Sequence, residues 1–125
     1  MRRDSPLAEK EVICPEDLWD KPLIVSHQKG DDAYLNQWLQ RKESELHIVA
    51  TYNLIFNASL LVDEGLGYAL CYDKLINTRG SNLCFRPFSP PMEARGFIVW
   101  KKYQVFSKAA TVFLQNLRES LEAEI

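Results

Sequence analysis

The chain has 125 residues, of which 46% are hydrophobic and 26% are charged. This length and composition are typical of one globular domain that folds without a disulfide or a structural metal. The 15 basic and 17 acidic side chains give a formal net charge of -2, which argues against a protein that holds nucleic acid on its own surface, because such surfaces carry an excess of Lys and Arg.

The first half of the chain alternates between apolar runs and amphipathic segments. Residues 15–18 predict a single helical turn, with a proline tolerated at its start. Residues 22–26 form an apolar run without polar alternation, which is typical of a strand buried on both faces of a parallel sheet. Residues 31–42 repeat apolar side chains at helical spacing and predict an amphipathic helix that packs on this sheet.

The same order of strand and helix then continues. Residues 47–51 predict a second strand. Residues 53–64 predict a second helix, which is apolar nearly all round and is therefore expected to be buried on most sides. Gly65 is placed to end this helix in the left-handed conformation, and residues 67–72 predict a third strand. This alternation predicts an α/β fold with a mostly parallel, doubly wound sheet flanked by helices.

The remaining sequence departs from this alternation. Residues 77–82 predict a turn-rich loop, and residues 83–88 and 95–101 predict two further strands on either side of a proline-rich patch. Ser107 is placed to cap a last helix. One side of that helix is apolar and needs a surface to bury it; the residues of this apolar stripe are Ala110, Phe113, Leu114, Leu117 and Leu121.

Polar side chains follow each of the three predicted parallel strands. In an open α/β sheet, ligands bind beyond the carboxyl ends of the strands, where helix N-termini suit a small anion or carboxylate. An alternative is that Ser26 and Asn53 merely cap a helix or a turn, although capping and binding are compatible. The candidate ligand-binding residues are Ser26, His27, Gln28, Thr51, Tyr52, Asn53 and Tyr72.

The sequence does not predict catalysis or a metal site. Ser26 and His27 are neighbours on an extended segment, so their side chains point to opposite faces and do not readily exchange a proton. The chain has 2 histidines, and His47 has no carboxylate or thiolate at ligand spacing. We therefore expect neither an enzyme nor a bound metal or cofactor.

The cysteine spacing and the lack of a membrane-spanning run predict a cytoplasmic location. Cys14, Cys71 and Cys84 are far apart and lack the paired spacing of a zinc or thiol-exchange motif. No run reaches the roughly 20 apolar residues of a membrane span, and the start of the chain is not a signal peptide. We expect free thiols in a reducing cytoplasm and no membrane partner.

Several phrases of the sequence, taken in order, resemble the effector-binding domain of LysR-type transcriptional regulators. Their order and spacing together are specific, and the resemblance covers essentially the whole chain. The phrases are Arg3-Asp4-Ser5-Pro6-Leu7-Ala8, Glu16-Asp17-Leu18 followed by Pro22-Leu23-Ile24, Gly65-Leu66-Gly67-Tyr68-Ala69-Leu70, Leu83-Cys84-Phe85-Arg86-Pro87, and Val99-Trp100-Lys101-Lys102 followed by Phe106-Ser107-Lys108-Ala109-Ala110 and Phe113-Leu114.

The resemblance implies two Rossmann-like lobes, similar to type 2 periplasmic binding proteins, with a small molecule bound between them. It implies that residues 1–90 form the second lobe and that residues 91–125 return to the first lobe. The DNA-binding helix-turn-helix of that family has no counterpart in this sequence. The cleft-facing contacts implied by position agree with the strand ends chosen above: Ser26, His27, Gln28, Thr51, Tyr52 and Asn53.

The expected function is an effector-sensing regulatory domain. It would bind a small, anionic metabolite between lobes and modulate DNA binding by the missing N-terminal domain, without touching DNA itself. An alternative interpretation is that the chain is a fragment of a soluble solute-binding protein. A third is a ligand-free oligomerisation module, because an exposed apolar stripe on the last helix would seek another chain. A homo-oligomer is expected on the same ground.

Overall fold

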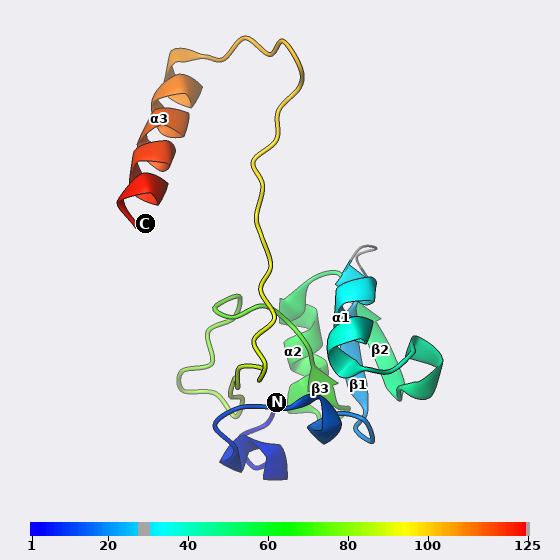
Figure 1. The fold of residues 1–125 in the computed structure, drawn as a ribbon. Coiled ribbons are helices and arrows are strands. Elements are labelled where there is room, and N and C mark those ends of the chain that lie inside the picture. Colours follow the sequence, from blue (N-terminus) through cyan, green and yellow to red (C-terminus); the bar gives the residue numbers. More distant parts are fainter. Residues whose placement is uncertain (28–30, 125) are drawn as a thin grey trace. The chain divides into compact units, whose positions relative to one another are not determined.

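The chain divides into two structural units. The structure, a computed structural model, describes residues 1–27 and 31–124, and its units are Met1–Glu93 and Ala94–Ile125 (Figure 1). The first unit contains the sheet and the helices that cover it. The second contains an extended segment followed by the last helix.

A parallel sheet forms the centre of the first unit. Within the described residues it has the strand order β2-β1-β3, formed by β1 (Leu23–Ser26), β2 (Ile48–Tyr52) and β3 (Tyr68–Ala69). The central strand β1 is buried at its first three residues, as its unbroken apolar run predicts. The prediction of an α/β fold with a parallel sheet is confirmed.

A helix covers each face of the sheet. On one face, Leu39 at the end of α1 (Asp31–Leu39) packs with Leu23 and Val25 of β1. On the other, α2 (Ile55–Asp63) packs against Ile24, because successive side chains of a strand point to opposite faces. Short 3₁₀ turns complete the unit: η1 (Pro6–Glu9), η2 (Pro15–Asp17), which confirms the predicted turn, and η3 (Glu43–Glu45).

The prediction that the second helix is buried on most sides is wrong. Ala58 and Val62 are fully or almost fully buried, but Phe56 and Leu60 expose 59% and 54% of their surface. A sheet whose last strand has two residues covers one side of α2 and leaves the other uncovered. The all-round apolar character of this helix therefore does not reflect burial in this unit.

Two predicted strands are absent from the described chain. Residues 83–88 form isolated bridges, Leu83 with Arg2 and Phe88 with Ile13, and residues 94–100 form none. For residues 83–88 the reason is that a strand forms only beside another extended segment with which it can exchange main-chain hydrogen bonds along its length. Residues 83–88 meet two separate short segments, and Pro87 has no N–H to donate.

Two glycines fix the path between α2 and β3. Gly65 ends the helix with a φ of +81°, and its N–H bonds Val62 O at 2.9 Å, which confirms the predicted left-handed cap. Gly67 lies so close to the first strand that a Cβ atom would overlap the Pro22 carbonyl oxygen. This close approach lets the Tyr68 N–H bond the same oxygen at 2.8 Å and start the pairing of β3 with β1.

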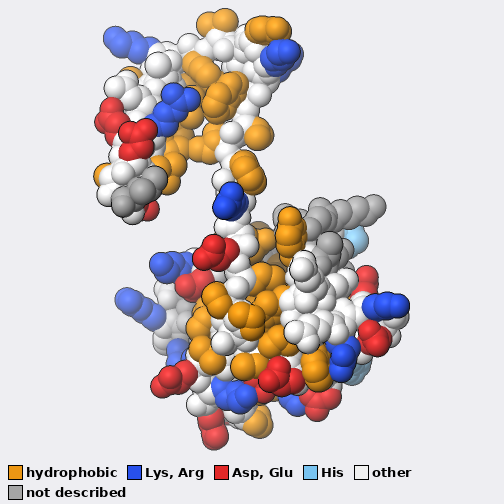
Figure 2. Space-filling model, in the orientation of Figure 1, with side chains coloured by type: hydrophobic (Ala, Val, Ile, Leu, Met, Phe, Trp, Pro, Cys, Tyr) orange, Lys and Arg blue, Asp and Glu red, His pale blue; other side chains and the backbone are white. Residues whose placement is uncertain are grey.

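The second unit contains helix α3 (Lys108–Ala123). Its cap is as predicted, because the Ser107 hydroxyl accepts a hydrogen bond from the Ala110 N–H at 3.2 Å. Phe113 and Leu121 of the apolar stripe are 62% and 55% exposed. Figure 2 shows many hydrophobic side chains on the surface of this unit.

Replacing Gly67 with alanine tests the close approach of β3 to β1. Gly67→Ala is expected to lower the free energy of unfolding by about 1–3 kcal/mol, because the backbone must move to relieve the overlap. Gly96→Ala is the control, since a Cβ atom there meets nothing within 4 Å, and it should leave stability unchanged or slightly raised. Urea denaturation followed by circular dichroism measures both; equal stability of the two variants would contradict the packing described.

Candidate functional site

The carboxyl ends of β1 and β2 bring most of the predicted ligand-binding residues together. Ser26, the last residue of β1, is the register partner of Tyr52, the last residue of β2, and the His27 N–H donates to Tyr52 O at 2.8 Å. Gln28 lies outside the described residues. We call the five that the structure brings to this edge the strand-end cluster: Ser26, His27, Thr51, Tyr52 and Asn53.

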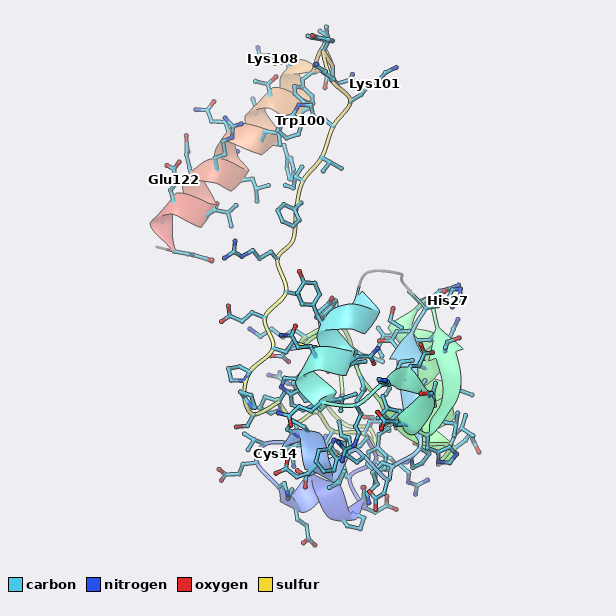
Figure 3. The ribbon with its side chains drawn as sticks, turned by 45° about the vertical axis from the view of Figure 1, so that its right-hand side comes forward. Cys14, His27, Trp100, Lys101, Lys108 and Glu122 are labelled. Carbon is cyan, nitrogen blue, oxygen red and sulfur yellow. The ribbon has the colours of Figure 1, made fainter. Side chains whose placement is uncertain are left out.

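Members of the strand-end cluster differ in how far they reach solvent. The side chains of His27, Thr51 and Asn53 are exposed, whereas Ser26 and Tyr52 are half-buried. Figure 3 shows His27 at the rim of the sheet, beyond the end of β1. The cluster therefore presents an imidazole, a hydroxyl and an amide to solvent, and each of these groups can donate a hydrogen bond.

Tyr52 joins the ends of all three strands. Its ring packs with the cluster formed by Ile24, Ala58 and Val62 on the α2 face of the sheet. Its hydroxyl donates to Leu70 O at 2.6 Å, in the residue that follows β3. Because β1 lies between β2 and β3, this bond spans the central strand and holds the three carboxyl ends at one edge.

The start of α2 lies directly after the cluster. The N-cap of α2 is Leu54, which offers no side-chain hydrogen bond, so Asn53 does not cap this helix. The first N–H groups of a helix have no partner within the helix, and no side chain caps them here. They give the edge a partial positive charge that favours an anion.

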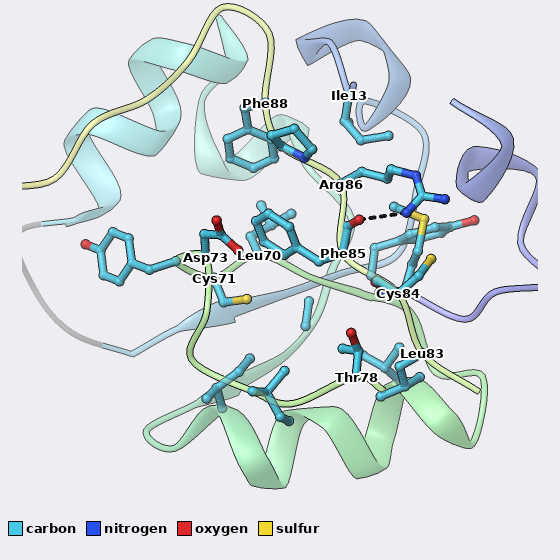
Figure 4. A pocket seen from close by; sticks show the side chains of 18 of the residues that line it. Ile13, Leu70, Cys71, Asp73, Thr78, Leu83, Cys84, Phe85, Arg86 and Phe88 are labelled. Carbon is cyan, nitrogen blue, oxygen red and sulfur yellow. Dashed lines mark hydrogen bonds between the residues drawn. The ribbon is translucent and has the colours of Figure 1, made fainter. Parts of the chain in front are cut away.

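An apolar cavity lies beside β3. Its volume is about 230 Å³, and it is bounded by α2, by the segment that follows β3 and by residues 83–88. Figure 4 shows Cys71 and Phe85 pointing into it above the helix. We call it the β3 cavity; of the predicted ligand-binding residues, Tyr72 lines it, apart from the strand-end cluster.

The polar groups of the β3 cavity are largely committed to the protein. The Arg86 guanidinium donates to the main-chain oxygens of Ala8, Lys10 and Phe85 at 2.7–2.8 Å, and the Ser59 hydroxyl donates to Phe56 O at 2.6 Å. Burial raises the pKa of the Cys71 thiol, against the smaller lowering effect of the N-terminal ammonium group. The thiol is therefore protonated and poorly nucleophilic at neutral pH.

The sequence pattern does not predict this cavity. It assigns residues 67–72 and 83–88 to strands, and strands at normal spacing leave no space between them. In the structure β3 ends at Ala69, and residues 83–88 pair with other segments instead. The cavity depends on the distance between segments far apart in the chain, for which the sequence carries no local signal.

Metal and membrane signals are absent from the part of the chain that is described. There, no three His, Cys, Asp or Glu side chains gather as a metal site. None of the helices between residues 1–27 or 31–124 is long and apolar enough to cross a membrane.

Comparison with known proteins identifies the family. Residues 1–122 match the LysR substrate binding domain. The chain belongs to this family. The match confirms the resemblance seen in the sequence and identifies the chain as part of the substrate-binding domain of a LysR-type transcriptional regulator.

A solved structure supports the fold of this LysR domain. The chain is similar to HinK, a LysR family transcriptional regulator from Pseudomonas aeruginosa, with a TM-score of 0.72 and 18% sequence identity. The similarity covers 97% of this chain and 43% of the HinK chain, so this LysR chain spans less than half of that protein. No curated protein matches the sequence.

Removing the Tyr52 hydroxyl tests its role in holding the strand ends. Tyr52→Phe is expected to lower the free energy of unfolding by about 1 kcal/mol, the net value of one hydrogen bond. Tyr34→Phe is the matched control, because Tyr34 is 70% exposed and its hydroxyl bonds none of the described residues; the stability of this variant should not change. If urea denaturation gives both variants the same stability, the bond to Leu70 does not contribute.

Proposed function

We propose that this chain is the effector-sensing part of a LysR-type regulator and that its strand-end cluster binds a small, anionic metabolite. The observation that carries the proposal is the register that sets Ser26 beside Tyr52 at the edge where α2 begins without a side-chain cap. Binding would alter the affinity for DNA of a DNA-binding domain outside this chain. The regulator would act in the cytoplasm, where its DNA lies.

The chemistry of the cluster favours a carboxylate. Hydroxyls of Ser26 and Thr51 and the amide of Asn53 are donors without formal charge, and the orphan N–H groups at the start of α2 add a partial positive charge. The described members of the cluster include no acidic side chain to repel an anion. Such a site recognises a small carboxylate by several hydrogen bonds rather than by one ion pair.

Signalling in this proposal needs two states. Residues 1–90 would be the second lobe, and residues 91–125 would belong to the first lobe, so that a metabolite at the strand ends lies between lobes. A ligand shifts an equilibrium only by binding one state better. Contacts from both lobes would be complete in the closed state alone, and closure would then be passed to the DNA-binding domain.

Catalysis is not part of the proposal. A reaction would need a nucleophile and an activating base in contact, and the described members of the strand-end cluster provide no such pair. We propose a binding protein without enzymatic activity.

One specific observation favours a second candidate, a ligand-free oligomerisation module. Phe113 and Leu121 on α3 expose more than half of their surface, and exposed apolar groups of this size often mark interfaces. The two candidates differ in one measurable respect, since an oligomerisation module does not respond to a metabolite.

Two substitutions in the strand-end cluster test the sensor. In the complete regulator, Thr51→Ala and Asn53→Ala are each expected to raise the effector concentration for half-maximal response by about tenfold, because each removes a hydrogen bond to a charged ligand. Ser44→Ala is the control, an exposed hydroxyl in η3, at the opposite end of β2. A reporter gene or DNA binding measures the response, and an unchanged value in both cluster variants would remove these residues from the site.

The chemical class of the ligand can be tested by measuring the melting temperature of the regulator in the presence of each member of a panel of small carboxylates and amino acids. A compound that binds the folded state alone stabilises it by about 2.7 kcal/mol at a hundred times its Kd. The melting temperature should rise with a carboxylate and rise less in Asn53→Ala. Stabilisation by neutral compounds but by no carboxylate would contradict the anionic ligand.

A further inference from the structure

The outer edge of β3 has main-chain groups that point away from β1. The N–H groups of Tyr68 and Leu70 donate to main-chain oxygens on the β1 side at 2.8 and 3.0 Å. Successive residues of a strand direct their N–H and C=O groups to alternate edges, so those of Ala69 and Cys71 face the opposite edge. Among the described residues, no main-chain hydrogen bond involves Cys71.

The β3 cavity lies along this edge and is formed by the first unit alone. Ala69 and Cys71 both belong to its lining, and apolar side chains surround them, among them Val62 on the α2 face of the sheet and Ile13 and Phe88 on the other. Every lining residue lies between positions 1 and 92, within the unit Met1–Glu93. The cavity is therefore complete without residues 94–125.

The volume of the β3 cavity sets the size of a molecule that would fill it. A dry cavity of about 150 Å³ with apolar walls holds one molecule of benzene. On the same scale, the cavity of about 230 Å³ holds a molecule about one and a half times as large as benzene. A fused bicyclic ring has this size.

The main-chain edge sets the polar chemistry of such a molecule. A hydrocarbon would fill the volume but leave the N–H and C=O groups of Ala69 and Cys71 without partners, which is costly in a buried place. A lactam has its N–H and C=O on the same side, so it can bond an N–H and a C=O of the edge together, as a neighbouring strand would. The charged side chains of the lining, Asp73 and Arg86, have opposite signs, so the cavity favours neither an anion nor a cation.

We propose that the β3 cavity is a second small-molecule site, which takes an uncharged, mainly apolar molecule of bicyclic size with a lactam-type amide at one end. The amide bonds the outer edge of β3, and the rings lie among the apolar side chains of the two faces. This site is separate from the strand-end cluster, and the proposal does not depend on the effector site.

Alkylation of Cys71 measures whether the cavity is occupied. Its thiol points into the cavity (Figure 4), whereas Cys14 is also half-buried but lies outside the lining. The chain is treated with N-ethylmaleimide with and without oxindole, a bicyclic lactam, and peptide mass spectrometry follows both cysteines. At about ten times its Kd, oxindole should slow the alkylation of Cys71 by about tenfold and leave that of Cys14 unchanged.

Two related molecules separate the hydrogen bonds from the apolar contacts. 1-Methyloxindole lacks the amide N–H, and indane lacks the whole amide. Each should need a concentration about tenfold higher than oxindole for the same protection of Cys71, because polar groups of the edge stay unpaired. No protection by oxindole at millimolar concentration would overturn the proposal, and so would equal protection of Cys14. Equal potency of the three molecules would exclude recognition by the β3 edge.

A cavity-filling variant tests where oxindole binds. Cys71→Phe places a ring of benzene size in the cavity, so oxindole should no longer raise the melting temperature. Leu75→Phe is the matched control, because Leu75 follows β3 in the same segment, is 56% exposed and is outside the lining; it should keep the shift, as should Asn53→Ala in the strand-end cluster. Loss of the shift in either control, or its retention in Cys71→Phe, contradicts the proposal. If Cys71→Phe does not fold, the protection of Cys71 in the unsubstituted chain decides.

Discussion

Burial of β1 on both faces is the constraint on which the rest of this structure depends. Leu23 and Val25 pack towards α1, while Ile24 packs towards α2. Burying each of these side chains stabilises the fold by about 1.5–3 kcal/mol, but only if a helix covers each face and a neighbour satisfies each edge. The parallel strands and the two covering helices follow from these requirements. The position of the strand-end cluster follows too, because parallel neighbours end at the same edge.

The two edges of β1 are hydrogen-bonded to their neighbours to different extents. β2 pairs along the whole of β1, from Leu23 to Ser26, whereas β3 pairs at two positions. The close contact at Gly67 brings the chain to β1, and the Tyr52 hydroxyl holds Leu70 at the far end. Between these fixed points the outer edge of β3 faces a cavity instead of another strand. The well-paired side carries most of the strand-end cluster, and the poorly paired side carries the cavity.

The spacing of apolar residues, together with capping and glycine residues, correctly predicted the elements whose structure depends on nearby residues in the sequence. The apolar run of β1, the helical spacing of α3, the left-handed Gly65 and the Ser107 cap are examples. Residues 83–88 and 95–101 were mispredicted because an apolar run shows that a strand is possible, and its partner is set by distant segments. At the site, parallel pairing predicted the meeting of Ser26 with Tyr52. The reach of the Tyr52 ring across β1 to Leu70, and the cavity at Cys71, depend on tertiary distances that no short stretch of sequence encodes.

The strand-end cluster and the β3 cavity are linked through one short segment. The Tyr52 hydroxyl of the strand-end cluster bonds Leu70 O, and Cys71, the next residue, faces the β3 cavity. Any group that fills the β3 cavity and strengthens the same bond would favour effector binding by the factor by which the effector favours that group, because coupling free energies are reciprocal. One hydrogen bond contributes about 1 kcal/mol, so coupling through it alone is limited to about fivefold. A larger coupling would require the lobes themselves to move.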